Sequence, residues 1–260
     1  MTFRLKVVLA AVAVLAACAL PNTSLAQPLE DIPGISGLHW LTGDVTLPRS
    51  GAIITVPAHA RLLTDADVGM FQYLVGGGNF DRTAEAELRF TRFGTIEFQF
   101  CNCGYAVADD WTCVKPDEVV NSIRRYYDER GWDEVIDFAR SPQFDRPHAT
   151  ITYMLHLRND KLPNYFEGDA LVFGRNGYET LVAVTLKGEA AGTWSELQKA
   201  IAAFRFTAGH TFDDHRPSDT ISVNHIAAQF ATKAGAADLV HRYALCSKKD
   251  IARATPMHSD

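Results

Sequence analysis

The chain has 260 residues, of which 47% are hydrophobic and 22% charged, and its formal net charge is −6. This composition excludes a disordered, collagen-like or coiled-coil protein. The acidic balance argues against nucleic acid as a partner, because proteins that bind nucleic acid carry basic patches or stripes.

Residues 1–26 have the pattern of a secretory signal peptide. Arg4 and Lys6 precede an unbroken apolar run over residues 7–20, which is shorter than the roughly 20 residues that a membrane-spanning helix needs. Small residues before Gln27 provide a cleavage site. An uncleaved N-terminal anchor is the alternative. Without this leader the chain has 23 basic and 31 acidic residues, a formal net charge of −8.

A second export signal overlaps the first. The sequence Leu-Ala-Ala-Cys that ends at Cys18 fits a lipobox, in which the cysteine is acylated and becomes the mature N-terminus. Two acyl chains would hold the protein stably at a membrane. Pro21, six residues before the bond that follows Ala26, favours ordinary cleavage instead. We therefore expect an exported, periplasmic protein, with Cys18 as its lipidation candidate.

The remaining sequence shows no internal repeat and no stretch of linker composition. We expect a lead-in segment over residues 27–39, a single domain over 40–235 and a polar tail over 236–260.

The first half of that domain predicts two strands, two helices and a third strand. Residues 44–47 and 52–56 form a hairpin around a turn-forming tetrad, and a helix follows from a capping box at Thr64 to the glycines at 76–78. Residues 95–100 alternate between apolar and polar side chains, which indicates a half-buried strand. Pro116 and the acids that follow it predict a helix that ends near Gly131.

The second half predicts a strand over residues 150–157 and a hairpin over 170–186, whose Asn176-Gly177 pair favours a type I′ turn. A helix should follow over 193–204, after a capping box. The last helix, over 220–234, should be capped by Ser218 or Asp219 and bury Val223, Ile226, Ala227 and Phe230. We therefore predict an α+β fold, an antiparallel sheet with amphipathic helices packed on it.

Four cysteines remain in an oxidising compartment once the leader is removed, and they allow three pairings. They are Cys101, Cys103, Cys113 and Cys246. We expect Cys113 to pair with Cys101 or Cys103 and so to close a short loop. Free thiols, or a metal or redox site, are the alternatives.

Histidines and acids gather near the last helix, but the sequence predicts no metal site and no cofactor there. His210, His215 and His225 alternate with Asp213, Asp214 and Asp219. Pro217 makes this segment a loop, and no recognised ligand spacing is present. Serine-nucleophile patterns are also missing, and adjacent acids such as Asp109 and Asp110 point apart on an extended chain, so no catalytic residue is predicted.

Six segments occur in an order that is more specific than any one of them. They are Leu47–Leu63, Gly78-Asn79, Gly104–Asp110, Ser141–Asp145, Phe173–Gly177 and Phe206–Asp219. In this order they resemble the DUF2167 family, bacterial proteins described as uncharacterised and membrane-anchored. The resemblance extends from about Trp40 to Gly235.

The motifs of the family fall on particular residues of this chain. They fall on Gly104, Tyr105, Val107, Asp109 and Asp110, then on Pro142, Phe144 and Asp145, on Gly174, Arg175 and Gly177, and on Asp214 and Asp219. The chain departs from the pattern where Phe144 and Phe212 replace tyrosine and in its cysteines. It also lacks the hydrophobic C-terminal segments common in the family, so membrane attachment would come from Cys18 or from a partner.

The resemblance implies no known reaction. The hairpin followed by a helix over residues 170–206 is similar to Mog1/PsbP-type modules, a likeness of fold that carries little functional weight. We expect a non-catalytic envelope module that binds an unidentified protein or envelope component. Its binding candidates are Tyr105, Asp110, Asp145, Arg175, Asp214 and Asp219.

Two other functions stay open. A hydrolase or metal-dependent enzyme would use the Asp, Arg and His set around Asp110, Asp145, Arg175 and Asp214. A small-ligand protein would show an apolar cleft with a few convergent polar groups. The plainest role for Arg175 is an ion pair with one of the acids that fixes the hairpin.

Overall fold

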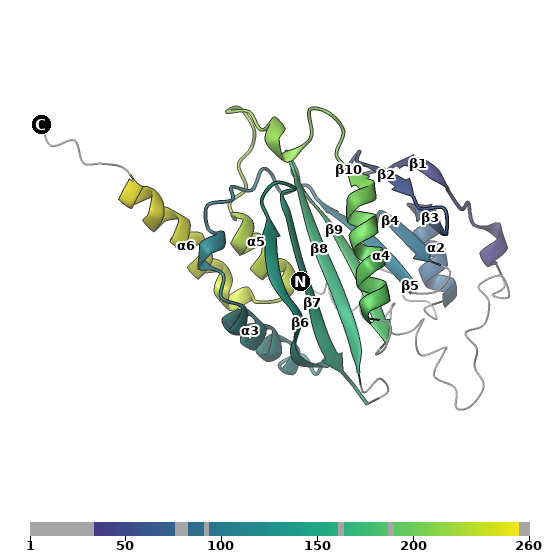
Figure 1. Ribbon diagram of the computed structural model, residues 1–260, viewed down its shortest axis with the longest axis horizontal. Coiled ribbons are helices and arrows are strands. Elements are labelled where there is room, and N and C mark those ends of the chain that lie inside the picture. The colour runs from purple at the N-terminus through teal and green to yellow at the C-terminus, as the bar shows by residue number, and fades with distance from the viewer. Residues whose placement is uncertain (1–33, 76–82, 91–93, 161–163, 187–189, 255–260) are drawn as a thin grey trace, which may run out of the picture.

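The computed structural model describes residues 34–75, 83–90, 94–160, 164–186 and 190–254. The predicted leader, Cys18 and the glycines at 76–78 lie outside these residues. Within them the predicted α+β fold is confirmed, with antiparallel sheets and helices packed on them (Figure 1).

The centre of the molecule is a seven-stranded sheet in which each strand is antiparallel to its neighbours. In spatial order its strands are β3 (Ala60–Thr64), β4 (Ala86–Phe90), β5 (Gly94–Cys101), β9 (Gly177–Leu186), β8 (Tyr165–Gly174), β7 (Thr150–Arg158) and β6 (Glu134–Asp145). The sequence analysis identified β5, β7, β8 and β9 and missed β3, β4 and β6.

One face of this sheet packs against a smaller sheet and a helix. The smaller sheet contains β1 (Gly43–Thr46), β2 (Ile53–Val56) and β10 (Phe204–Arg205), and it includes the hairpin predicted at 44–56. Helix α4 (Ala190–Ala203) crosses β8 and β9 (Figure 1). The apolar side chains of this layer form one continuous core that includes Ile54, Phe98 and Leu197.

The opposite face is covered by α3 (Pro116–Asp128), α5 (Ile226–Ala234) and α6 (Ala237–Ala254). Phe230 of α5 lies at the centre of this second core, where its ring packs against Trp111 and Tyr153 with centroids 5.6 and 5.3 Å apart. Helix α2 (Ala66–Val75) contacts β3 at the other end of the sheet. The sheet is therefore buried on both faces.

Burial on both faces corrects the expectation of a half-buried β5. Glu97 and Gln99 lie on its polar side, yet each is only 8% exposed. Gln72 of α2 donates to Glu97 at 3.1 Å, and Lys233 of α5 donates to Gln99 at 2.9 Å. The alternating pattern was correct, but helices rather than solvent cover the polar face.

The predicted polar tail is also wrong, because residues 237–254 form helix α6. Leu239 and Tyr243 are buried on the side that faces α3 and α5, and Asp238 pairs with Arg125 at 2.6 Å. The segment is rich in charged residues, but its buried apolar residues, Leu239 and Tyr243, are four positions apart and so lie on one face of the helix. In the predicted lead-in segment, a short helix η2 (Ile35–Gly37) buries Ile35, and the next residue, Leu38, is buried in the same cluster as Phe71.

The last predicted helix begins later than expected, at Ile226, and its N-cap is His225 rather than Ser218 or Asp219. Val223 is 93% exposed, whereas the other three predicted core residues of this helix are buried. Residues 206–225 instead form a loop with one short helix, η4 (Phe212–Asp214).

Candidate functional site

Four of the six predicted binding residues meet where the β8–β9 turn contacts the loop before α5. Arg175 lies in the turn, and its Nε and Nη2 donate to the two oxygens of Asp219 at 2.7 and 2.6 Å. A third donor, Nη1, reaches the carbonyl of Gly209 at 3.1 Å. The guanidinium group holds the pKa of Asp219 well below its usual range. This ion pair fixes the loop against the hairpin, which is the plain role considered for Arg175.

Asp214 and Tyr105 complete the same corner. The carboxylate of Asp214 accepts bonds from the side chain and backbone of Thr211 at 2.6 and 2.9 Å, which lowers its pKa and caps η4. The ring of Tyr105 stacks on His215 with centroids 3.9 Å apart and on Phe212 at 4.8 Å. The side chains of this corner therefore make contacts with one another that order the loop.

Asp110 contacts the start of α5 rather than this corner. Its two oxygens accept the backbone N–H groups of Ala227 and Ala228 at 2.9 and 3.3 Å, at the start of α5. Burial raises its pKa to about 6, although these amides and His225 oppose the shift. The neighbouring Asp109 pairs with His225 at 2.6 Å. Both acids therefore anchor the first turn of α5.

Asp145 stands apart from the other predicted residues. It is exposed at the end of β6 and pairs with His148, three residues further on, at 2.7 Å. The six predicted residues thus form one cluster of four, one helix cap and one hairpin contact. No group of three or more metal-binding side chains occurs in the part of the chain that the structure describes.

The cysteines pair differently from the prediction. Cys101 bonds to Cys103, and Cys113, in η3 (Trp111–Cys113), bonds to Cys246 in α6. The prediction favoured a short loop that included Cys113 and placed Cys246 in a polar tail. Since α6 packs on α3 and α5, it brings Cys246 to Cys113 from 133 residues away.

A cavity of about 750 Å³ opens between β5, β9 and the helices α5 and α6. Its walls combine aromatic and aliphatic side chains with a few polar groups. They are Thr83, Gln99, Phe100, Cys101, Asn102, Tyr126, Tyr178, Thr180, Thr232, Lys233, Gly235, Ala237 and Val240. This volume is in the range of small-molecule sites, which are largely apolar with a few placed polar groups.

Buried polar residues continue from the cavity wall into the sheet. Lys233 donates to Gln99, and Gln99 donates to Glu97, which lies directly across from Glu87 on β4. Burial raises the pKa of Glu87 to about 7, and the charge of Arg89 opposes that rise. The wall of the cavity therefore carries a polar group, formed by Gln99 of β5 and Lys233 of α5, among apolar side chains.

The sequence does not predict this cavity. The alternation over residues 95–100 places Gln99 on the polar side of a half-buried strand, and no pattern in the sequence singles out Lys233. A signal existed in the row of polar residues on β5, but it becomes informative only once a helix is known to cover that row.

These features define an α+β protein with a buried antiparallel sheet, a polar corner that orders its loops and a cavity of the size of small-molecule sites. The chain belongs to the family described as "Protein of unknown function (DUF2167)", whose model matches residues 39–247. The resemblance inferred from the motif order is thereby confirmed.

A solution structure of cyanobacterial PsbP (CyanoP) from Synechocystis sp. PCC 6803 is similar to this chain, with 11% sequence identity and a TM-score of 0.38. The match covers 63% of this chain and 91% of that one. A likeness of this degree bears on neither function nor site. No curated protein sequence matches the chain. None of the described helices is both long and apolar enough to cross a membrane.

Proposed function

We propose that this protein is an exported, non-catalytic module of the periplasm that binds an amphipathic envelope component in the cavity between the sheet and α5. The observation that carries the proposal is the composition of the cavity wall. Tyr126, Tyr178 and Val240 offer apolar surface, whereas Lys233 and Gln99 offer polar groups at one side. Such a wall suits a molecule with an apolar body and an acidic or hydrogen-bonding head.

The non-catalytic assignment is supported by the use that the fold makes of its acids. Asp110 holds the start of α5, Asp214 caps η4 and Arg175 is committed to Asp219. A hydrolase would need such groups within hydrogen-bond reach of one reacting centre. In this protein these three side chains instead make separate contacts that order the backbone.

Export is part of the proposal and is supported by the leader pattern of residues 1–26 and by two disulfides, which persist in oxidising compartments. Membrane attachment would come from a lipid on Cys18 or from a partner. A mass spectrum of the mature protein separates cleavage before Gln27 from acylation of Cys18, because the two products differ in length and in lipid.

The binding proposal is tested with anilinonaphthalene sulfonate, a fluorescent probe with an aromatic body and an anionic head. We expect saturable binding to the purified protein. Ala237→Trp should abolish it by filling the cavity, and Lys233→Gln should weaken it. Leu245→Trp, on an exposed position of α6 outside the cavity, is the matched control. Equal binding by the Ala237→Trp and Leu245→Trp variants would overturn the assignment of the cavity as the site.

A further inference from the structure

The bridge between Cys101 and Cys103 closes a loop of only three residues at the end of β5. So short a loop restrains the unfolded chain little. The bridge from Cys113 to Cys246 spans 133 residues and ties α6 to η3. A structural staple therefore explains the second bridge well and the first one poorly.

The short bridge borders the cavity. Cys101 and Asn102 both line its wall, and Cys101 is partly exposed. Cys113 and Cys246 lie outside this lining. A molecule of small-peptide size that enters the cavity would therefore meet Cys101 in its wall, since sites of this volume accommodate such ligands.

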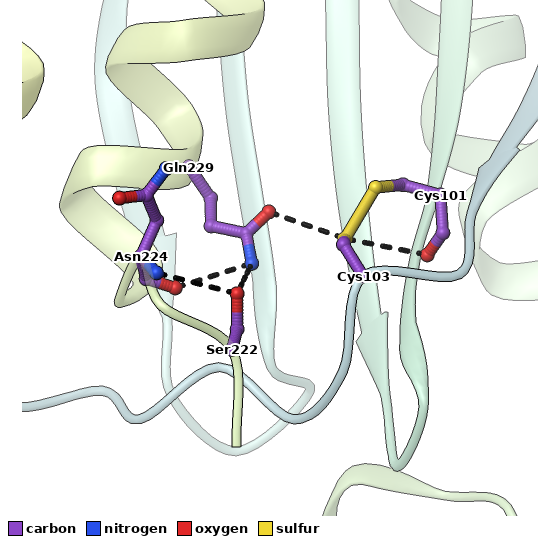
Figure 2. Close-up of a disulfide and its surroundings, with 5 residues drawn as sticks. All are labelled: Cys101, Cys103, Ser222, Asn224 and Gln229. Carbon is purple, nitrogen blue, oxygen red and sulfur yellow. Dashed lines mark hydrogen bonds between the residues drawn. A yellow bond between two sulfur atoms is a disulfide. The ribbon is translucent and has the colours of Figure 1, made fainter. Parts of the chain in front are cut away.

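Gln229 of α5 is aimed at the other sulfur. Its Nε2 donates to Ser222 Oγ at 2.7 Å and to the carbonyl of Asn224 at 3.2 Å, which fixes the orientation of the amide (Figure 2). Its Oε1 then lies 3.4 Å from Cys103 Sγ. The side chain is 5% exposed, so this acceptor is shielded from water. A disulfide sulfur has no hydrogen to offer it, but a reduced Cys103 thiol would donate to it.

The cavity wall also carries a cation. Lys233 lies one helical turn after Gln229 and lines the same cavity as Cys101. Nearby cations favour the thiolate form of cysteine. The two sulfurs thus have different surroundings, a cation-lined cavity for Cys101 and a buried acceptor for Cys103.

We propose that the Cys101–Cys103 bridge is a redox site that exchanges with a thiol of small-peptide size in the cavity, and that Gln229 stabilises its reduced form. This role is separate from the ligand binding proposed above, and failure of the dye to bind would leave it standing.

The exchange balances as two thiol–disulfide steps. A thiolate of the incoming molecule attacks Cys101 Sγ, the Cys101–Cys103 bond breaks, and the Cys103 thiolate that leaves takes up a proton from water. The resulting S–H group of Cys103 donates a hydrogen bond to Gln229 Oε1. A second thiolate attacks the incoming sulfur of the mixed disulfide and releases Cys101. Two thiols are oxidised to one disulfide, and the protein's bridge is reduced to two thiols.

The first experiment equilibrates the purified protein with mixtures of reduced and oxidised glutathione, quenches with acid, alkylates free thiols and identifies the modified peptides by mass spectrometry. We expect Cys101 and Cys103 to be alkylated at ratios that leave Cys113 and Cys246 bridged. The variant with Cys113→Ala and Cys246→Ala should give the same curve for the short bridge. Reduction of the short bridge only together with the long one, or only after unfolding, would overturn the proposal.

The second experiment tests Gln229 as a positioning residue. Gln229→Met keeps the shape of the side chain and removes the acceptor, so the equilibrium constant for reduction of the bridge should fall about fivefold, which corresponds to one neutral hydrogen bond. Ser222→Ala removes a partner of Nε2 and keeps Oε1, and it should shift that equilibrium less. An equal shift in both variants would contradict the role of Gln229.

The third experiment tests the route. Ala237→Trp and Thr232→Trp, two independent ways to fill the cavity, should slow the reaction of the bridge with reduced glutathione at least tenfold without changing the equilibrium. Leu245→Trp is the control. Circular dichroism of each variant serves as the check that the variant is folded. An unchanged rate in the folded cavity-filled variants would overturn access through the cavity.

Discussion

Arg175 and Asp219 lie face to face in a two-point ion pair, with N–O distances of 2.7 and 2.6 Å, and they connect parts of the chain that are 44 residues apart. The side chains are 17% and 10% exposed. The planar fork of arginine matches a carboxylate in a way that the single ammonium group of lysine does not. The pair therefore adds a side-chain link to the backbone contacts between the β8–β9 turn and the loop that leads to α5.

Replacement of Arg175 by lysine should lower the urea concentration at the midpoint of unfolding, even though the charge is kept. The same measurement on Lys199→Arg, whose exposed side chain forms a one-point pair with Glu196 on α4, should show little change. If the Arg175→Lys variant is as stable as the parent protein, the two-point geometry of the ion pair does not contribute to the free energy of unfolding.

The same pair predicts an acid dependence. Because Arg175 depresses the pKa of Asp219 in the folded protein, the unfolded chain binds this proton at a higher pH than the folded one does. The stabilisation is present above the unfolded pKa of about 3.9 and is lost as the pH falls through the lower folded value. Asp219→Asn should therefore destabilise the protein at pH 7 and much less at pH 2, as measured by urea unfolding at both values.

Gly177 permits the close approach that places the Cys101–Cys103 loop. A Cβ at this position would lie 1.8 Å from the carbonyl oxygen of Cys101, in a backbone conformation with φ near +151°. Gly177→Ala should cost about 3 kcal/mol, because a backbone carbonyl cannot yield as a flexible side chain does. Gly51 also has a positive φ, of 66°, but has open space around it, so Gly51→Ala should cost only about 1 kcal/mol. Urea unfolding of the two variants measures the difference, and equal losses would contradict the contact.

The two disulfides should contribute very differently to stability. In the chain-entropy account, a bridge across 133 residues contributes about 5 kcal/mol, and a bridge across three residues about 1.5 kcal/mol. The Cys113→Ala, Cys246→Ala variant should therefore unfold at a much lower temperature than the Cys101→Ala, Cys103→Ala variant. Thermal unfolding followed by circular dichroism measures both. Similar melting temperatures would mean that α6 stays docked without its bridge.

The elements predicted correctly carry their signals within a few residues. The pair Asn176-Gly177 marks the β8–β9 hairpin, but the predicted type I′ turn is wrong, because Gly174 pairs with Gly177 and Asn176 lacks the positive φ that such a turn requires. Pro116 with the acids after it marks the start of α3. The strand over 150–157 was visible in its alternation. Each of these signals lies within a few neighbouring residues, so it does not depend on how distant segments of the chain pack.

The wrong predictions concern residues whose contacts are made by segments far away in the sequence. Asp219 has the chemistry of a helix cap, but Arg175 takes its carboxylate from 44 residues away. Cys246 could be paired only if α6 were known to dock. The cavity needs β5, β9 and α5 in their final places before Gln99 and Lys233 can be seen to share a wall. The sequence therefore predicts the class of fold and four clustered residues, and it misses the cavity and the bridges.

Asp110 gives the protein a stability that falls as the pH rises. Burial raises the pKa of its carboxyl group to about 6 in the folded protein, so the folded state holds this proton at a pH where the unfolded chain has released it. The contribution is complete below an unfolded pKa of about 3.9 and is lost as the pH rises through about 6, a difference of about 3 kcal/mol.

Asp110→Asn keeps an acceptor for the first turn of α5 and removes this titration, so its unfolding free energy should vary less between pH 4 and pH 7 than that of the parent protein. Glu87→Gln, on β4, should remove a separate titration whose folded pKa is about 7. The two effects should add, because the groups share no partner. Urea unfolding at several pH values measures them. A parent-like pH profile in the Asp110→Asn variant would show that the amides at the start of α5 keep this carboxylate ionised despite its burial.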